Sequence, residues 1–203
     1  MRRGGVPLRL RAMARNPWQR LSTRPIYETP WFSVRRDDVV RPDGQPGTYS
    51  VVHSERLAVG VVPLWDDGTV TLVGQWRYPL EEYSWEIPEG GGDPAREAIE
   101  AARAELREEA GIEAHGWVYL GRCHTSNCWT DEVGHLFLAR ALVQGVPEPG
   151  GDEEIATRRV PLAEALAMAS DGRITDAISI VGLFRAAGFL EVERASSSAT
   201  RDR

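Results

Sequence analysis

Residues 85–112 read WEIPEGGGDPAREAIEAARAELREEAGI, and the rest of the chain is organised around them. It begins as a short apolar run, passes through glycines at positions 90–92, and continues as a predicted helix. Asp93 is a natural N-cap, Pro94 suits the first helical position, and Gly111 is a typical stop signal. The stretch therefore predicts a glycine loop that leads directly into a helix.

Three acidic side chains lie near the C-terminal end of this predicted helix. Glu105, Glu108 and Glu109 fall at i, i+3 and i+4, so their carboxylates share one face. On an exposed face, the repulsion costs a few tenths of a kcal/mol, and a solvated acidic surface explains the pattern. In a partly buried cleft, two charges ~6 Å apart repel by roughly 3 kcal/mol at an effective dielectric of 20, which calls for a cation. The glycine loop favours the second interpretation, because it lets a backbone carbonyl approach the acidic face.

The stretch resembles the Nudix box, G-x5-E-x7-R-E-U-x-E-E-x-G-U, in which U is apolar. The positions that match are Gly90, Glu105, Leu106, Glu108, Glu109, Gly111 and Ile112. Two positions differ: Ala104 stands where the box has its arginine, and Arg96 stands where it has its first glutamate, although Glu97 is the next residue. We expect these two positions to brace the loop and the helix rather than to hold metal, with Arg103 or Arg107 as a substitute brace.

The resemblance implies a hydrolase that cleaves a diphosphate by attack of water, with Mg²⁺ as its cofactor or Mn²⁺ in its place. Magnesium prefers carboxylate and carbonyl oxygens. Glu105 and Glu109 are the predicted carboxylate ligands, with Glu108 as a further ligand or a support. The backbone carbonyl of Glu89, just before the glycines, is the predicted main-chain ligand.

The whole chain suits one domain with appendages. It has 203 residues and a net charge of −6, which argues against a nucleic-acid binder held by phosphate contacts. No apolar run reaches the length of a membrane span, and the two cysteines match no zinc pattern, so we expect reduced thiols and a cytoplasmic protein. The predicted divisions are a disordered or mis-assigned N-terminal extension (1–25), an N-terminal β unit (26–56), a Nudix catalytic domain (57–192) and a disordered tail (193–203).

The segment YETPW at residues 27–31 opens the predicted N-terminal β unit. This unit resembles the piece that precedes the catalytic domain in the Nudix enzymes similar to ADP-ribose pyrophosphatase. The resemblance implies a homodimer in which the unit forms one wall of the substrate site. Trp31 can stack on a base there, or it can be a buried aromatic of the sheet or the dimer interface.

Three further residues are candidates for substrate binding. Arg77 follows a predicted strand and can grip a phosphate, or it can pair on the surface with Glu81 or Glu82. Glu86 lies within an apolar run, so we expect it to face the metal site or an arginine. Glu132 ends the loop HTSNCWTDE (124–132), which in the resembling enzymes lies over the substrate.

The acidic, Pro- and Gly-rich segment VPEPGGDEEI (146–155) has the profile of a surface loop. In the resembling subgroup, the corresponding loop carries the glutamate that activates water. Glu153 is the predicted general base, with Glu154 as the nearest alternative. A solvated acidic turn without a catalytic role is the competing interpretation.

The order of predicted elements indicates an α/β protein. Strands are predicted at 31–34, 38–40, 48–52, 57–64, 69–74, 117–124 and 133–143, and helices follow at 161–172 and 174–190. This order is consistent with a Nudix α/β/α sandwich around a mixed sheet, preceded by an antiparallel β extension. The resemblance points to ADP-ribose, cleaved to AMP and ribose 5-phosphate. The alternatives are another nucleotide sugar such as GDP-mannose, or a sensor that binds a nucleotide sugar with little turnover.

Overall fold

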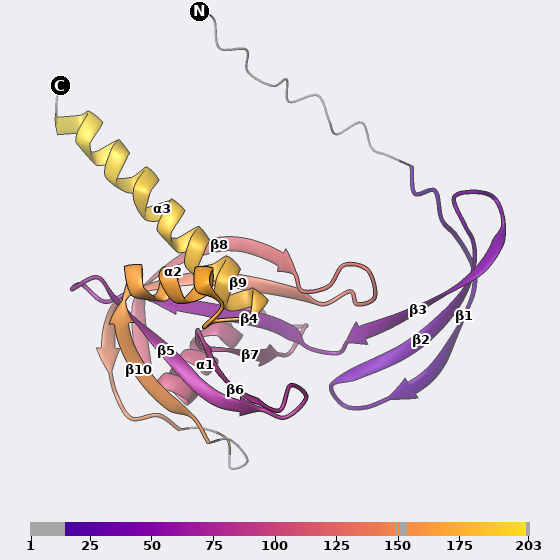
Figure 1. Cartoon of the computed structure of the whole chain (residues 1–203), viewed down its shortest axis with the longest axis horizontal. Helices are drawn as coiled ribbons and strands as arrows, with labels where there is room; N and C mark the ends of the chain where they lie inside the picture. The colour runs from indigo at the N-terminus through magenta and orange to yellow at the C-terminus, as the bar shows by residue number, and fades with distance from the viewer. Residues whose placement is uncertain (1–14, 149, 151–153, 202–203) are drawn as a thin grey trace, which may run out of the picture.

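The computed structural model describes residues 15–148, 150 and 154–201, and in this part of the chain it contains three sheets and three helices (Figure 1). In chain order the elements are β1 (Gln19–Glu28), β2 (Phe32–Val40), β3 (Pro46–Ser54), β4 (Leu57–Pro63), β5 (Thr69–Arg77), β6 (Glu82–Glu86), β7 (Glu89–Gly92), α1 (Ala98–Ala110), β8 (Ile112–His124), β9 (Val133–Gln144), β10 (Ala156–Pro161), α2 (Leu162–Asp171) and α3 (Ala177–Arg201). None of these helices has the length and apolar character of a membrane span.

The N-terminal sheet has the antiparallel order β1-β2-β3 and projects to one side of the main body (Figure 1). It begins at Gln19, whereas the sequence predicts a disordered extension up to residue 25 and a β unit from residue 26. All ten residues of β1 are exposed, and their sequence, QRLSTRPIYE, lacks the alternation of polar and apolar residues that identifies a strand. Pairing with β2, from Gln19 opposite Val40 to Glu28 opposite Ser33, forms the strand instead.

The main body contains two further sheets. Strands β10, β5 and β6 form an antiparallel sheet, and β7, β4, β9 and β8 form a mixed sheet in which β4 and β9 run parallel. The predicted mixed α/β architecture is confirmed. The short strands β6, β7 and β10 are not among the predicted strands. Strand β6 is only five residues long and is followed by Pro88, three of the four residues of β7 are glycines, and β10 contains two arginines.

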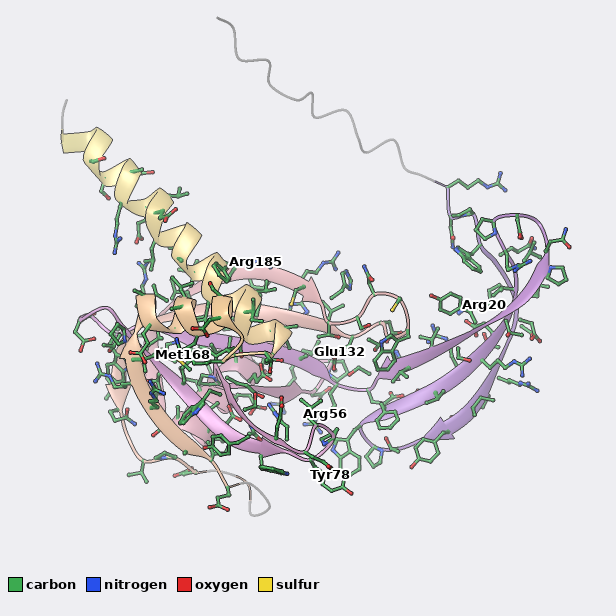
Figure 2. The ribbon with its side chains drawn as sticks, in the orientation of Figure 1. Arg20, Arg56, Tyr78, Glu132, Met168 and Arg185 are labelled. Atoms are coloured by element: carbon green, nitrogen blue, oxygen red, sulfur yellow. The ribbon has the colours of Figure 1, made fainter. Side chains whose placement is uncertain are left out.

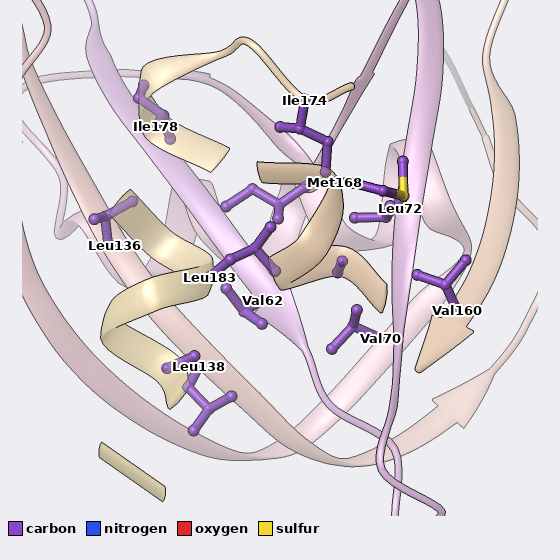
Figure 3. Packing of buried hydrophobic residues seen from close by; sticks show 13 residues of the cluster. Val62, Val70, Leu72, Leu136, Leu138, Val160, Met168, Ile174, Ile178 and Leu183 are labelled. Atoms are coloured by element: carbon purple, nitrogen blue, oxygen red, sulfur yellow. The ribbon is translucent and has the colours of Figure 1, made fainter. Parts of the chain in front are cut away.

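Two clusters of buried residues lie on opposite faces of the mixed sheet. Val62 of β4 and Leu136 of β9 pack with α2 and α3 in the larger cluster, part of which is drawn in Figure 3. Val61 and Phe137, their neighbours in the chain, point the other way and pack with Leu106 of α1. This alternation follows from the two-residue period of a strand, and it fixes α1 against the sheet that contains β7. The glycines predicted as a loop are thus paired with β4 as a short edge strand, and we keep the name glycine loop for residues 89–92.

Helix α1 begins later than the sequence predicts. Its N-cap is Glu97, in an extended conformation, and its first residue is Ala98. Asp93 instead accepts a hydrogen bond from the backbone N–H of Ala95 at 2.9 Å, which makes a turn before the helix. The predicted end is confirmed, because Gly111 has a φ of 63° and caps the helix in the left-handed conformation.

The C-terminal segment also differs from its prediction. Residues 193–201 continue α3, where the sequence predicts a disordered tail. The hydroxyls of Ser196 and Ser197 donate to the carbonyls of Val192 and Glu193, one turn earlier, at 2.9 and 3.0 Å. These bonds give the hydroxyls partners within the helix, although bonds of this kind do not themselves stabilise a helix.

Candidate active site

A cavity of about 590 Å³ lies where the N-terminal sheet meets the main body. Its lining includes Trp31 after β1, Arg56 before β4, Arg77 at the end of β5, and Glu132 before β9. Figure 2 shows Arg56 and Glu132 near this junction. The cavity therefore combines residues from both parts of the chain, and Glu86 also lines it, so all four predicted substrate-binding residues lie there.

The glycine loop brings the first predicted metal ligand close to the cavity. A Cβ atom placed on Gly90 would lie only 2.3 Å from the carboxyl carbon of Glu105. The carboxylate of Glu105 therefore occupies space that any other residue at position 90 would fill. A glycine at position 90 therefore allows the Glu105 carboxylate to approach the backbone closely, and no unusual backbone angle is involved. Gly90 itself lines the cavity.

The second predicted ligand is tied to the same loop. The Glu109 side chain is buried, and its Oε2 accepts a hydrogen bond from the backbone N–H of Glu89 at 2.8 Å. Helix α1 and strand β7 are thus connected through the residue whose carbonyl is the predicted main-chain ligand. Glu108 lies further out, and its carboxylate is 3.4 Å from the Arg107 guanidinium. Glu105 and Glu108 together line a second, smaller cavity along α1.

Arg77 holds two acidic residues at the cavity wall. Its guanidinium donates to both carboxylate oxygens of Glu86, through Nε at 2.9 Å and through one terminal nitrogen. The same terminal nitrogen lies 3.1 Å from Glu89 Oε1. Glu86 is only 2 % exposed, and its hydrogen bonds raise the pKa of Arg77, although burial acts in the other direction. The sequence predicts that Glu86 faces either the metal site or an arginine, and the structure shows the arginine. Arg77 therefore pairs with Glu86 rather than with Glu81 or Glu82.

Glu89 is an unusual carboxylate for its surroundings. Its Oε2 is buried and has no hydrogen-bond partner in the described part of the chain. Burial raises the pKa of Glu89 well above its usual range, and the nearby carboxylates of Asp176 and Glu86 raise it further, while Arg77 lowers it. A buried oxygen without a partner, beside the carboxylates of Asp176 and Glu86, suits a divalent cation chemically. In the described residues, however, no three acidic, thiol or imidazole groups converge into a metal-binding cluster.

The remaining predicted residues lie in different settings. Trp31 is 64 % exposed at the cavity edge, so it is not a buried aromatic within this chain. Glu132 also lines the cavity and accepts a hydrogen bond from Thr125 Oγ1 at 2.7 Å. Glu154 is exposed, whereas Glu153, the predicted general base, lies outside the described residues.

Two residues of the cavity are absent from the sequence prediction. Arg56 lines both cavities, and one of its terminal nitrogens donates to the carbonyl of Gly91 at 3.2 Å. Asp176 accepts a hydrogen bond from the backbone N–H of Ser179 at 2.6 Å, as an N-cap of α3 does. An aspartate before an apolar run is a sequence signal for such a cap. The sequence gives Arg56 no comparable signal, because it lies far from the box in the chain.

This fold and this acidic site define a class of protein: the chain belongs to the Nudix family. The family model described as the NUDIX domain matches residues 54–183, and a model described as the nucleoside diphosphate sugar hydrolase N-terminal domain matches residues 18–52. The predicted family is therefore confirmed, and the protein is a Nudix hydrolase.

The chain is also similar to individual proteins of known name. An ADP-ribose pyrophosphatase from Mycobacterium tuberculosis is 34 % identical over 175 residues, which cover 84 % of each chain. An ADP-ribose pyrophosphatase from Bacillus subtilis is 32 % identical over 143 residues, covering 70 % of this chain and 77 % of the relative. The solved structure of an ADP compounds hydrolase superposes with a TM-score of 0.78 at 23 % identity, covering 87 % of this chain and 95 % of the other, which shows a shared fold.

Proposed function

We propose that this protein hydrolyses the diphosphate of ADP-ribose to AMP and ribose 5-phosphate. The observation that carries this proposal is the contact of two α1 carboxylates with one glycine loop, Glu105 at Gly90 and Glu109 at Glu89, at the wall of a large cavity. The similarity to two enzymes named ADP-ribose pyrophosphatase supports the choice of substrate. Another nucleotide sugar, such as GDP-mannose, is the alternative substrate.

Nudix hydrolases generally use divalent metal ions, and we propose Mg²⁺ here, with Mn²⁺ able to replace it. Glu105 and Glu109 would hold the ion, with Glu108 and the carbonyl of Glu89 in support. A bound ion of this kind neutralises charge on the diphosphate and lowers the pKa of an attacking water. The protein's own contribution is to fix the carboxylates, because the buried Glu109 is held by a backbone N–H and Glu105 packs on a glycine.

Proton removal from the attacking water requires a base near the cavity. We propose Glu153 for this role, with Glu154 as the alternative, because both lie in the acidic loop before β10. The substrate would lie between Trp31, whose exposed ring can stack on a base, and Glu132 on the opposite loop. Arg77 would face a phosphate while Glu86 fixes the plane of its guanidinium.

The N-terminal sheet supports a proposal of a homodimer. Large apolar side chains on β1 and in the turn after it are exposed, including Leu21, Ile26 and Tyr27, each more than half exposed, and Trp31. Exposed apolar patches of this kind mark sites of association. A second copy of this chain is the proposed partner, and we propose that the enzyme works in the cytoplasm.

A turnover panel tests the proposed function. The purified protein is incubated with ADP-ribose, GDP-mannose and other nucleotide sugars, with Mg²⁺ or Mn²⁺, and release of the nucleoside monophosphate is measured. We expect AMP release from ADP-ribose to be the fastest reaction and to require the metal. Tight binding of ADP-ribose without release of AMP would instead support the sensor alternative.

A further inference from the structure

The two positions that differ from the Nudix box lie on the same cavity. Arg96 and Ala104 both line the smaller cavity, of about 370 Å³, along α1. The box places a glutamate and an arginine at these positions. In this chain, the first has the opposite charge and the second has only a methyl group, so an ion pair between them cannot form. Glu105 and Glu108 line the same cavity, so the missing pair lies directly beside the proposed metal ligands.

The two arginines within the helix do not replace the missing pair. The guanidinium carbon of Arg103 lies 5.9 Å from the centre of the Trp117 ring, on the side of α1 that faces β8. Arg107 pairs with Glu108 at 3.4 Å, and both arginines line a separate cavity with Trp117. Neither lines the cavity beside the glycine loop. The sequence-based expectation that one of them braces the loop is therefore not supported by these contacts.

An arginine from outside the box contacts the glycine loop instead. Arg56 lies just before β4, and one of its terminal nitrogens donates to the carbonyl of Gly91 at 3.2 Å. Its Nε would lie 3.1 Å from a Cβ atom on Gly91, so the side chain packs closely on the loop. Gly91 is one residue from Gly90, which Glu105 contacts, and two residues from Glu89, which Glu109 contacts. A group that fixes Gly91 thereby fixes both contacts.

We propose that Arg56 is a positioning residue that holds the glycine loop against α1 in place of the missing box pair. The inference deepens the proposed function and rests on it, because the loop matters for turnover only if the α1 carboxylates hold the catalytic ion. Arg56 also lines the larger cavity, so a direct contact with substrate is the rival explanation for any loss of activity. The two explanations differ in whether restoring the box makes Arg56 dispensable.

The test compares Arg56→Gln in two backgrounds: the natural sequence and the variant Arg96→Glu/Ala104→Arg, which restores the box pair. The readouts are the Kd for Mn²⁺ without substrate, and kcat and KM for ADP-ribose. In the natural background, we expect Arg56→Gln to weaken Mn²⁺ binding and to lower kcat by about tenfold, as is typical when a residue that orients metal ligands is lost. In the restored background, we expect both losses to shrink to about twofold or less.

Equal losses in both backgrounds would overturn the proposal, because Arg56 would then not stand in for the box pair. A rise in KM with unchanged Mn²⁺ affinity would also overturn it, because Arg56 would then act on the substrate. Arg103→Gln is the matched variant, and a weakening of Mn²⁺ binding by Arg103→Gln but not by Arg56→Gln would place the brace within the helix and also overturn it. Failure of the natural protein to release AMP from ADP-ribose would instead refute the proposed function. The Mn²⁺ affinities of the four proteins would still decide the role of Arg56.

Discussion

The backbone N–H of Glu89 donates a hydrogen bond to the carboxylate of Glu109, 2.8 Å away. The contact joins β7 to the last turn of α1, and it satisfies part of a carboxylate that is only 3 % exposed. Without such a partner, a buried charge at the negative end of a helix dipole would be costly. The glycine loop therefore stabilises the acidic end of α1 as well as positioning it.

The close approach at Gly90 predicts a loss of metal binding in Gly90→Ala. The added methyl group would overlap the Glu105 carboxylate, which can swing away because it is the free end of a flexible side chain. We expect the Kd for Mn²⁺ to rise about tenfold while the melting temperature changes little. Gly188→Ala is the matched control, since nothing lies within 4 Å of its Cβ position in α3. Unchanged Mn²⁺ affinity in Gly90→Ala would show that Glu105 is not a ligand of the metal.

The Arg77–Glu86 pair predicts a large effect on stability. Arg77→Ala would leave Glu86, which is 2 % exposed, without its guanidinium, and we expect the free energy of unfolding to fall by roughly 3 kcal/mol. Adding Glu86→Gln should recover part of that loss, because a neutral amide is less costly to bury. Urea denaturation of the natural protein, Arg77→Ala and Arg77→Ala/Glu86→Gln measures both effects. If Arg77→Ala is as stable as the natural protein, the Arg77–Glu86 pair does not contribute to stability.

A contact between Asp131, in the loop at residues 124–132, and strand β3 of the N-terminal sheet predicts that stability depends on pH. Burial alone would raise the pKa of Asp131, but hydrogen bonds from His53, the Ser54 N–H and Arg35 lower it below its usual value. A lowered pKa in the folded state contributes stability above the unfolded pKa of about 3.9, and this contribution is lost as the pH falls through the folded value. Asp131→Asn should therefore lower the melting temperature at pH 7, and the difference should shrink in acid. A difference that is constant with pH would show that the charge of Asp131 contributes nothing.

Substitution of the proposed general base in the acidic loop before β10 should reduce turnover without weakening metal binding. Glu153→Gln should depress kcat for ADP-ribose while largely sparing the Kd for Mg²⁺, because a general base acts on the water rather than on the ion. Glu154→Gln is the matched control and should turn over normally. If the two variants exchange these results, Glu154 is the base.

The local part of the site is predictable from the sequence, because its signals are close together in the chain. The spacing of Glu105 and Glu109 predicts a shared face of α1, and the glycines before the helix predict a close approach, which the structure shows at Gly90. The end of α1 is likewise predictable from Gly111. Its beginning is not, because Asp93 has the residue type of an N-cap but serves a turn instead.

The long-range part of the site is not predictable in the same way. Arg56 reaches Gly91 across 35 positions of the chain, and nothing in its own neighbourhood indicates this contact. Strand β1 is similarly hidden, because ten exposed residues carry no hydrophobic period and the strand depends on its pairing with β2. Both features follow from tertiary structure rather than from local sequence preference.

We propose that Glu105 and Glu109 bind a divalent ion against the glycine loop, and crystals soaked in Mn²⁺ provide the test. Manganese has a measurable anomalous signal, so the position of the ion can be assigned independently of the protein density. We expect an anomalous peak between these two carboxylates and the carbonyl of Glu89, and no such peak in Glu109→Gln. Hydrolysis of ADP-ribose by crystals whose Mn²⁺ lies elsewhere would show that these carboxylates do not hold the catalytic ion.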